Sequence, residues 1–131
     1  DRGRLSNMTA KVLDARVFDE AAREKADVVM AYLPCSGLGV IGTKTDIKYN
    51  ASEEKIAELA ALQQEILHVV CGYVKPDGTL LYSTCTMTRE ENEDNVQKFR
   101  GTHAGFELEQ MRQYFPYEGC DGFFMAKIHR R

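Results

Sequence analysis

Hydrophobic residues along this chain gather in short runs that predict the strands of a sheet. Residues 26–33 (ADVVMAYL) form a near-continuous apolar run, which is typical of a strand buried on both faces of a parallel sheet. Residues 79–84 (TLLYST) predict a second strand, after the turn sequence PDG. Shorter apolar runs at residues 11–13, 106–110 and 122–129 predict three further strands, one before these two and two after them.

Apolar positions spaced three and four residues apart predict the helices. The spacing is clearest at residues 52–71, where two glutamates occupy the first turn and favour the positive end of the helix dipole. Residues 18–25 predict a short helix with Asp19 as its cap. The sequence Thr88-Arg89-Glu90-Glu91 matches a capping box, so it predicts a helix over residues 88–100.

The order of these predicted elements defines the fold class. Strands and helices alternate three times, and two strands with no helix between them follow. Alternation of this kind predicts an α/β protein with a largely parallel sheet, and the final pair predicts an antiparallel hairpin at its C-terminal edge. Functional residues of such sheets lie just beyond the carboxyl ends of the strands, so the candidate site is expected there.

Composition narrows the class of protein further. The 131 residues are 44% hydrophobic and 28% charged, which fits one globular domain and excludes a disordered chain. No apolar run approaches the ~20 residues that a membrane span needs, and no signal peptide is visible, so we expect a cytoplasmic protein without membrane contact. The net charge of −3 offers little general attraction for phosphates, although lysines and arginines gather near both ends.

Two of the four cysteines follow directly on predicted strands. Cys35 lies in the sequence PCSGLG after residues 26–33, and Cys85 lies in STCT at the end of residues 79–84. The chain between the two predicted strands contains a loop, a helix and a turn. A connection of this kind places two parallel strands side by side, so both cysteines are expected to face one cleft. The cysteines have no CxxC spacing, so no metal site is expected. The alternative to a reactive pair is two buried, inert thiols.

Several short sequences carry a resemblance to a known family. They are PCSGLGV, DIKYN, the helical stretch AALQQEIL, YSTCT, EEN and DGFF, and together they span most of the chain. In this combination the chain resembles the Sun/Fmu type of S-adenosylmethionine-dependent RNA (cytosine-5) methyltransferases, whose best-known members act on ribosomal RNA. The resemblance implies that residues 1–131 are the C-terminal part of the catalytic domain, with a truncated Rossmann-like class I methyltransferase fold.

The same resemblance implies the chemistry and the site residues. Cys85 would be the nucleophile that adds to carbon 6 of cytosine, and Cys35 would assist release of the product, in a covalent mechanism that divides one difficult step into easier ones. Asp14 would contact the adenine of the cofactor, S-adenosylmethionine. Tyr32 and Pro34 would line the site of the cofactor and the target base. The expected partner is RNA, in particular ribosomal RNA.

The chain departs from the resembling family in two places. Tyr32 stands where the family has an aspartate, and tyrosine is neutral at pH 7 and supplies no carboxylate. The family's Gly-rich cofactor loop and basic RNA-binding region are also absent, so the first strands of the sheet are expected to be missing. The isolated chain is then expected to be inactive, to bind cofactor weakly, and to dimerise or swap a strand at its open edge.

Two other functions fit parts of the sequence. A non-catalytic remnant or RNA-binding accessory domain would explain Tyr32, the absent cofactor loop and the acidic net charge. A DNA cytosine-5 methyltransferase would use the Pro-Cys motif, here Cys35, as its nucleophile, but that class lacks the STCT sequence. Comparison of Cys35→Ala with Cys85→Ala separates the two kinds of methyltransferase.

Overall fold

The computed structural model describes residues 10–36, 52–115 and 122–131, so the predicted loop that contains DIKYN lies outside the described residues. In chain order the elements are η1 (Glu20–Ala22), β1 (Ala26–Tyr32), α1 (Glu53–Val70), η4 (Cys71–Tyr73), β2 (Val74–Thr84), α2 (Glu93–Thr102), β3 (Phe106–Tyr114) and β4 (Phe123–Arg130), where η marks a turn of 3-10 helix. No helix among these residues is both long and apolar enough to cross a membrane.

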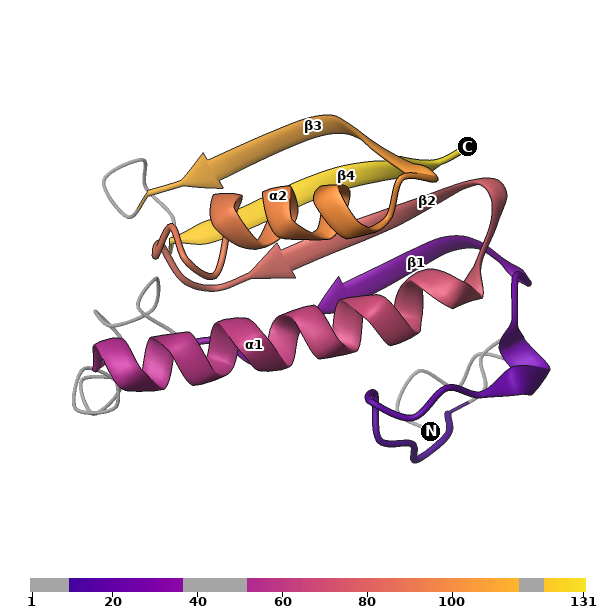
Figure 1. Cartoon of the computed structure of the whole chain (residues 1–131), viewed down its shortest axis with the longest axis horizontal. Helices are drawn as coiled ribbons and strands as arrows, with labels where there is room; N and C mark the ends of the chain where they lie inside the picture. The colour runs from indigo at the N-terminus through magenta and orange to yellow at the C-terminus, as the bar shows by residue number, and fades with distance from the viewer. Residues whose placement is uncertain (1–9, 37–51, 116–121) are drawn as a thin grey trace.

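The four strands form one sheet in the order β1-β2-β4-β3 (Figure 1). Strands β1 and β2 are parallel, whereas β4 is antiparallel to both β2 and β3. The predicted α/β class and the antiparallel C-terminal hairpin are therefore confirmed. Because β1 and β2 run in the same direction, their carboxyl ends lie at the same edge of the sheet.

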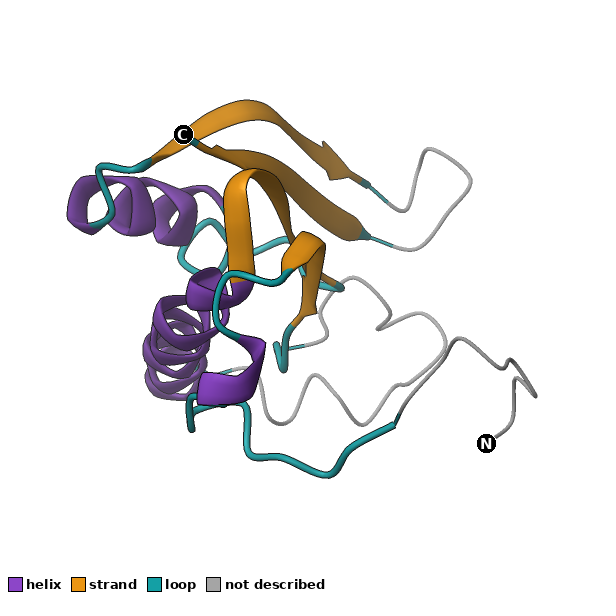
Figure 2. Cartoon of the chain, turned by 90° about the vertical axis from the view of Figure 1, so that its right-hand side faces the viewer, coloured by secondary structure: helices purple, strands orange, loops and turns teal. Residues whose placement is uncertain are grey.

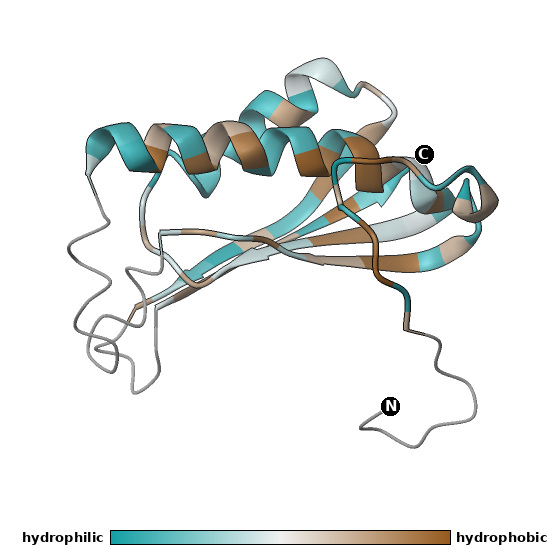
Figure 3. Cartoon of the chain, turned by 90° about the horizontal axis from the view of Figure 1, so that it is seen from below, coloured by the Kyte–Doolittle hydropathy of each residue, from teal (hydrophilic) through white to brown (hydrophobic). Residues whose placement is uncertain are grey.

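Both helices lie on one side of the sheet, and the core lies between the helices and the strands (Figures 2 and 3). The completely buried side chains at its centre are large and apolar or aromatic: Leu67, Leu80, Tyr82, Phe99, Phe124 and Ile128. Burial of each such side chain contributes about 1.5–3 kcal/mol relative to exposure. Four of these six residues belong to the neighbouring strands β2 and β4, so the carboxyl end of β2 is firmly packed at the centre of the sheet.

Helix α1 begins at the position that the sequence predicts, and a close contact with the N-terminal segment follows its C-terminus. The Ser52 hydroxyl caps the helix by accepting a hydrogen bond from the Lys55 amide at 3.1 Å. After the helix, the chain continues through η4. A Cβ atom at Gly72 would lie 2.7 Å from the ring of Phe18, so this glycine allows the N-terminal segment to approach the helix end.

Helix α2 begins at Glu93, later than the capping-box pattern predicts. Thr88 does bond to Glu91, but its hydroxyl donates to the carboxylate and does not accept from a helix amide. Asn92 precedes the helix with φ −105° and ψ −97°, which is outside the helical region. Glu91 and Asn92 are completely buried, and their side-chain hydrogen bonds hold the backbone in a turn where the pattern predicts helix.

The strand predicted at residues 11–13 is wrong. Val12 is fully exposed, and none of the described strands pairs with this segment. A strand needs a neighbour for its backbone amides and carbonyls, so an apolar run without one stays irregular and solvated.

The helix predicted at residues 18–25 is shortened to η1. Asp19 caps this turn as predicted, because its carboxylate accepts a hydrogen bond from the Ala21 amide. The segment is held to the far end of α1 by aromatic contact, since the rings of Phe18 and Tyr73 stack with 4.9 Å between their centroids. The Tyr73 hydroxyl also accepts a hydrogen bond from the Asp19 amide at 2.9 Å.

Strand β1 is an edge strand with one open face. Val28, Met30 and Tyr32 are 54%, 78% and 63% exposed, whereas Ala31 between them is buried. The prediction that this strand is buried on both faces is therefore wrong, because in the described part of the chain the helices cover only one face of the sheet. Dimerisation or strand swapping at this edge stays a prediction.

Candidate active site

Cys35 and Cys85 lie beyond the carboxyl ends of two neighbouring parallel strands. Tyr32 of β1 is the register partner of Ser83 of β2, and the Leu33 amide donates to the Ser83 carbonyl at 3.2 Å. This register carries both cysteines past the sheet together, and their Sγ atoms lie 3.0 Å apart. The predicted meeting of the two thiols is therefore confirmed, whereas their catalytic roles stay predictions.

The contact between the two sulfurs is close and non-covalent. A disulfide bond is about 2.05 Å long, so a separation of 3.0 Å leaves both cysteines as thiols. The Cys85 amide also points at Cys35, with 3.4 Å between the nitrogen and Sγ. Both residues are half-buried, which leaves them open to a substrate. One sulfur can therefore pass a proton to the other.

Glu91 holds the segment that carries Cys35. Its carboxylate is completely buried and accepts hydrogen bonds from the Ser36 amide at 2.8 Å and the Ser36 hydroxyl at 2.7 Å. Gln63 of α1 donates to it at 3.2 Å, and the Thr88 hydroxyl donates to it as well. A buried carboxylate is tolerated only where such donors replace its water. These donors make Glu91 a firm anchor for the residue after Cys35.

Asn92 holds the segment that carries Cys85. The Thr84 hydroxyl donates to the Asn92 side-chain oxygen at 2.6 Å, and the Asn92 amide nitrogen donates to the Thr86 carbonyl at 3.0 Å. The same nitrogen donates to Gln113 of β3 at 2.7 Å. Within the described residues, no buried side-chain nitrogen or oxygen lacks a hydrogen-bond partner. The segment around Cys85 is therefore as firmly placed as the one around Cys35.

Tyr32 stands beside the predicted nucleophile. A hydrogen bond between its hydroxyl and Cys85 raises the pKa of Tyr32 to about 12, and partial burial adds to this shift. The Tyr32 ring lies 6.1 Å from the ring of Phe123, measured between centroids. Tyr32 thus supplies a neutral hydroxyl and an aromatic face at the position where the sequence resemblance predicts a carboxylate.

Pro34 contributes its backbone carbonyl to the structure of the site. Gln63 of α1 donates to this carbonyl at 2.7 Å, and its own side-chain oxygen accepts from the Tyr82 hydroxyl at 3.3 Å. Gln63 is completely buried, so it acts as a structural amide that ties α1 to the Cys35 segment.

Asp14 lies away from the two cysteines. Its carboxylate accepts two side-chain hydrogen bonds from Arg16, at 3.0 and 2.8 Å, and these bonds lower the pKa of Asp14 to about 2. Its segment packs at the carboxyl end of α1, where Arg16 and Phe18 share a pocket with His68. Figure 1 shows this indigo segment beside the start of β1, at the end of the sheet opposite the carboxyl ends of β1 and β2. The structure therefore brings Cys35, Tyr32, Pro34 and Cys85 together but leaves Asp14 apart.

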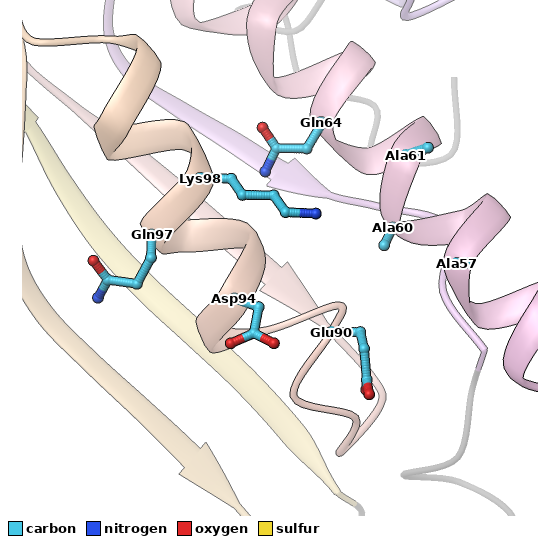
Figure 4. Close-up of a pocket in the computed structure, with 8 residues that line it drawn as sticks. All are labelled: Ala57, Ala60, Ala61, Gln64, Glu90, Asp94, Gln97 and Lys98. Carbon is cyan, nitrogen blue, oxygen red and sulfur yellow. The ribbon is translucent and has the colours of Figure 1, made fainter.

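A groove between α1 and α2 has a volume of 580 Å³ and includes none of the predicted site residues. Figure 4 shows Ala57, Ala60, Ala61 and Gln64 on α1 and Asp94, Gln97 and Lys98 on α2, with the Lys98 side chain extending towards α1 and Glu90 at one end. The alanines leave this space because their side chains are short. The groove therefore lies on the helical layer, separate from the strand ends that carry the thiols.

The sequence patterns missed the importance of Glu91 and Asn92. Both lie in the short sequence EEN, which contributed to the family resemblance. The capping-box pattern assigned Glu91 to a helix terminus, where an acid satisfies backbone amides. Its burial depends on Ser36 and Gln63, which come from distant parts of the chain, so no local pattern could predict it.

The fold defines the class of protein to which this chain belongs, that of the Rossmann-like class I methyltransferases. The crystal structure of PH0851 superposes with a TM-score of 0.87 at 34% identity, over 92% of this chain and 30% of that chain. A methyltransferase homolog protein from Pyrococcus horikoshii superposes with a TM-score of 0.61 at 28% identity, over 80% of this chain and 39% of that chain.

The chain belongs to the family described as 16S rRNA methyltransferase RsmB/F, whose family model matches residues 2–129. Ribosomal RNA small subunit methyltransferase B of Proteus mirabilis is 37% identical over 126 residues, which cover 94% of this chain and 30% of that protein. The predicted membership of the Sun/Fmu type is thereby confirmed. The chain spans about a third of the length of the curated relatives it matches.

Proposed function

We propose that this chain forms the C-terminal part of a methyltransferase catalytic domain, and that the whole protein methylates carbon 5 of cytosine in ribosomal RNA. The observation that supports this most is the 3.0 Å contact between Cys35 and Cys85 at the ends of adjacent parallel strands. Relatives named ribosomal RNA small subunit methyltransferase B and F support the choice of substrate. The family implies S-adenosylmethionine as the methyl donor.

A thiol nucleophile explains how a weakly nucleophilic carbon can be methylated. A bond from the Cys85 sulfur to carbon 6 of cytosine makes the ring electron-rich at carbon 5. Carbon 5 would then bond to the methyl group while the bond between that methyl and the sulfonium of S-adenosylmethionine breaks, which leaves S-adenosylhomocysteine, and carbon 5 would give up its proton to a base. The electron pair of that carbon–hydrogen bond restores the ring double bond, while the bond between carbon 6 and sulfur breaks and releases Cys85 as a thiolate.

Cys35 has the role of assisting this release. Its sulfur lies 3.0 Å from that of Cys85, which is close enough to donate a proton to the departing thiolate. A thiol carries one proton that it can donate, which is what this role requires of Cys35. The Ser36 and Thr86 hydroxyls, each next to one of the cysteines, are bonded to each other at 2.7 Å and keep the pair together.

The described residues fit the thiol half of this reaction and not the cofactor half. S-adenosylmethionine, when bound, supplies an electrophilic methyl group. Asp14, the predicted adenine contact, is engaged by Arg16 away from the cysteines, and Tyr32 provides no carboxylate. We therefore expect this chain alone to be inactive and to bind the cofactor weakly. Calorimetry on the 131-residue chain tests this, and tight binding would contradict it.

The decisive experiment traps the covalent adduct. RNA that contains 5-fluorocytosine is incubated with S-adenosylmethionine and the full-length protein that carries this chain. Fluorine at carbon 5 does not leave as a proton does, so the bond between Cys85 and carbon 6 cannot be broken and a protein–RNA adduct accumulates. We expect the adduct to be lost in Cys85→Ala and to persist in Cys35→Ala and in the control Cys71→Ala, whose thiol lies in η4 outside the site.

A non-catalytic RNA-binding remnant is the second candidate. The observation that favours it is Tyr32, an uncharged residue at the position of the family's aspartate, and the net charge of −3 agrees with weak phosphate binding by this part of the protein. Folded full-length protein that forms no adduct would support the remnant. Loss of the adduct in Cys35→Ala and not in Cys85→Ala would instead indicate the chemistry of a DNA cytosine-5 methyltransferase.

A further inference from the structure

Glu91 and Asn92 are adjacent in sequence, and each is bonded to one of the two cysteine-bearing segments. Glu91 accepts both hydrogen bonds of Ser36, the residue directly after Cys35. Asn92 bonds to the residues on either side of Cys85, because it accepts from the Thr84 hydroxyl and donates to the Thr86 carbonyl. The two cysteine segments are thus attached to neighbouring positions of one short stretch of backbone.

This stretch of backbone is itself held in place. The Asn92 amide donates to the Thr88 carbonyl at 3.2 Å, which closes the turn before α2. The Tyr82 hydroxyl, which is completely buried under the sheet, donates to the Glu91 carbonyl. Gln63 supports the Glu91 carboxylate from α1. Because adjacent residues in a fixed turn cannot move apart, the segments that they hold cannot move apart either.

We propose that Glu91 and Asn92 are positioning residues that together set the separation of the two sulfurs. Glu91 fixes the Cys35 segment, Asn92 fixes the Cys85 segment, and the peptide bond between them fixes one segment relative to the other. The roles that this gives to the thiols rest on the proposed function, but the geometric claim concerns only their separation. In this proposal the EEN sequence positions the two cysteine segments and does not cap a helix.

The chemistry of the Glu91 side chain predicts which substitution breaks the arrangement. One carboxylate oxygen accepts from the Ser36 amide and Gln63, and the other accepts from the Ser36 and Thr88 hydroxyls. Glu91→Gln can be accommodated, because its NH₂ group can face the two hydroxyls, which accept as well as donate. Glu91→Ala removes both acceptor oxygens, so the Ser36 amide loses its buried partner and the Cys35 segment must shift to relieve this.

Thiol–disulfide exchange measures the separation without any methyl transfer. The full-length protein is equilibrated with a series of reduced and oxidised glutathione mixtures. Oxidation of the two protein thiols to a disulfide reduces one molecule of glutathione disulfide to two molecules of glutathione. The disulfide-linked peptide containing Cys35 and Cys85 is then quantified by mass spectrometry. The equilibrium constant for forming this disulfide reports the effective concentration of the Cys35 thiol at the Cys85 thiol.

We expect Glu91→Ala and Asn92→Ala to lower this effective concentration about tenfold or more, because a misplacement of about 1 Å has effects of this size. Val96→Ala is the matched control, since Val96 is completely buried in the same α2 region but belongs to the apolar core. It is expected to lower the thermal stability and leave the disulfide equilibrium unchanged. Ser36→Ala removes a hydroxyl contact to Glu91 and is the second test where Glu91→Ala does not fold.

An unchanged equilibrium in Glu91→Ala, Asn92→Ala and Ser36→Ala would overturn the proposal, and so would an equal decrease in Val96→Ala. These outcomes are independent of the adduct experiment. If the substitutions lower the disulfide equilibrium but no RNA adduct forms, only the proposed reaction is refuted. If an adduct forms but the disulfide equilibrium is unchanged, only the positioning role is refuted.

Discussion

The two ends of this sheet are stabilised by different kinds of polar interaction. At the carboxyl ends of β1 and β2, the carboxylate of Glu91 and the amide of Asn92 are completely buried and bonded to neutral donors and acceptors. At the opposite end, charged side chains pair on the surface, as in the ion pairs of Asp14 with Arg16 and of Glu20 with Arg23, both at 2.8 Å.

The difference shows where polar groups have structural consequences. Exposed ion pairs contribute about 0–1 kcal/mol, because water and salt screen them. A buried group that loses its partner costs about 1–3 kcal/mol, and more if it is charged. The buried network is therefore the part of the molecule in which a single polar substitution should move the cysteines, and the ion-paired end should tolerate change.

The largest effect is expected from Glu91→Ala. The substitution removes the buried acceptor of the Ser36 amide and of the Ser36 and Thr88 hydroxyls, and it leaves the Gln63 NH₂ group with only the Pro34 carbonyl, so the free energy of unfolding should fall by about 3 kcal/mol or more. Urea denaturation followed by circular dichroism measures this. A decrease no larger than that of an exposed ion-pair substitution would remove the contrast between the two ends.

A smaller effect is expected from Tyr82→Phe. The ring and its edge-on contact with Phe124 remain, but the hydrogen bonds from the hydroxyl to the Glu91 carbonyl and to Gln63 are lost. The free energy of unfolding should fall by about 1–2 kcal/mol. Urea denaturation again provides the measurement, and an unchanged stability would show that the network does not depend on this hydroxyl.

Alkaline pH should destabilise the protein through Cys71, at the ion-paired end of the sheet. Burial raises the pKa of this thiol from its ordinary value of 9.0 to about 11, so the fold favours the neutral form. Its contribution to stability is complete below pH about 9 and is lost as the pH rises towards about 11. Unfolding free energies across this range should decline less steeply in Cys71→Ala than in the parent, and parallel curves would refute the assignment.

The smallest effect is expected from Asp14→Asn, because the pair with Arg16 is exposed. Hydrogen bonds from Arg16 lower the pKa of Asp14 from 3.8 to about 2, so this pair stabilises the fold above pH about 4 and loses its effect as the pH falls towards 2. Nuclear magnetic resonance of the carboxyl carbon should show a midpoint near 2 at low salt that moves upward in 1 M salt, where the Debye length is about 3 Å. Little change in stability at neutral pH is expected for Asp14→Asn.

Local patterns predicted the elements whose stability is local, and they failed where distant partners decide. The N-terminus of α1 follows from Ser52 and two glutamates that act within one turn. The position of α2 does not follow from its capping box, because Glu91 is drawn into contact with Ser36, which lies 55 positions earlier in the chain. Val12 fails as a strand residue because no described strand lies beside it.

For the site, the order of the elements was enough to bring Cys35 and Cys85 together. Two cysteines that each follow a strand must meet if those strands are parallel neighbours, and the sequence between them contains the helix that parallel pairing requires. The position of Asp14 could not be predicted in this way. It depends on how the N-terminal segment packs against η4, through Phe18 and Tyr73.

The sequence by itself determined the family, the order of strands and helices from residue 26 onward, and the pair of thiols, because these depend on residue type and spacing along the chain. Only the tertiary structure decided that Glu91 and Asn92 hold the two cysteine segments, that Tyr32 lies beside Cys85, and that the Asp14 segment lies at the other end of the sheet. These contacts join groups from separate segments, and a buried hydrogen bond forms only when the packing of the whole sheet brings donor and acceptor within about 3 Å.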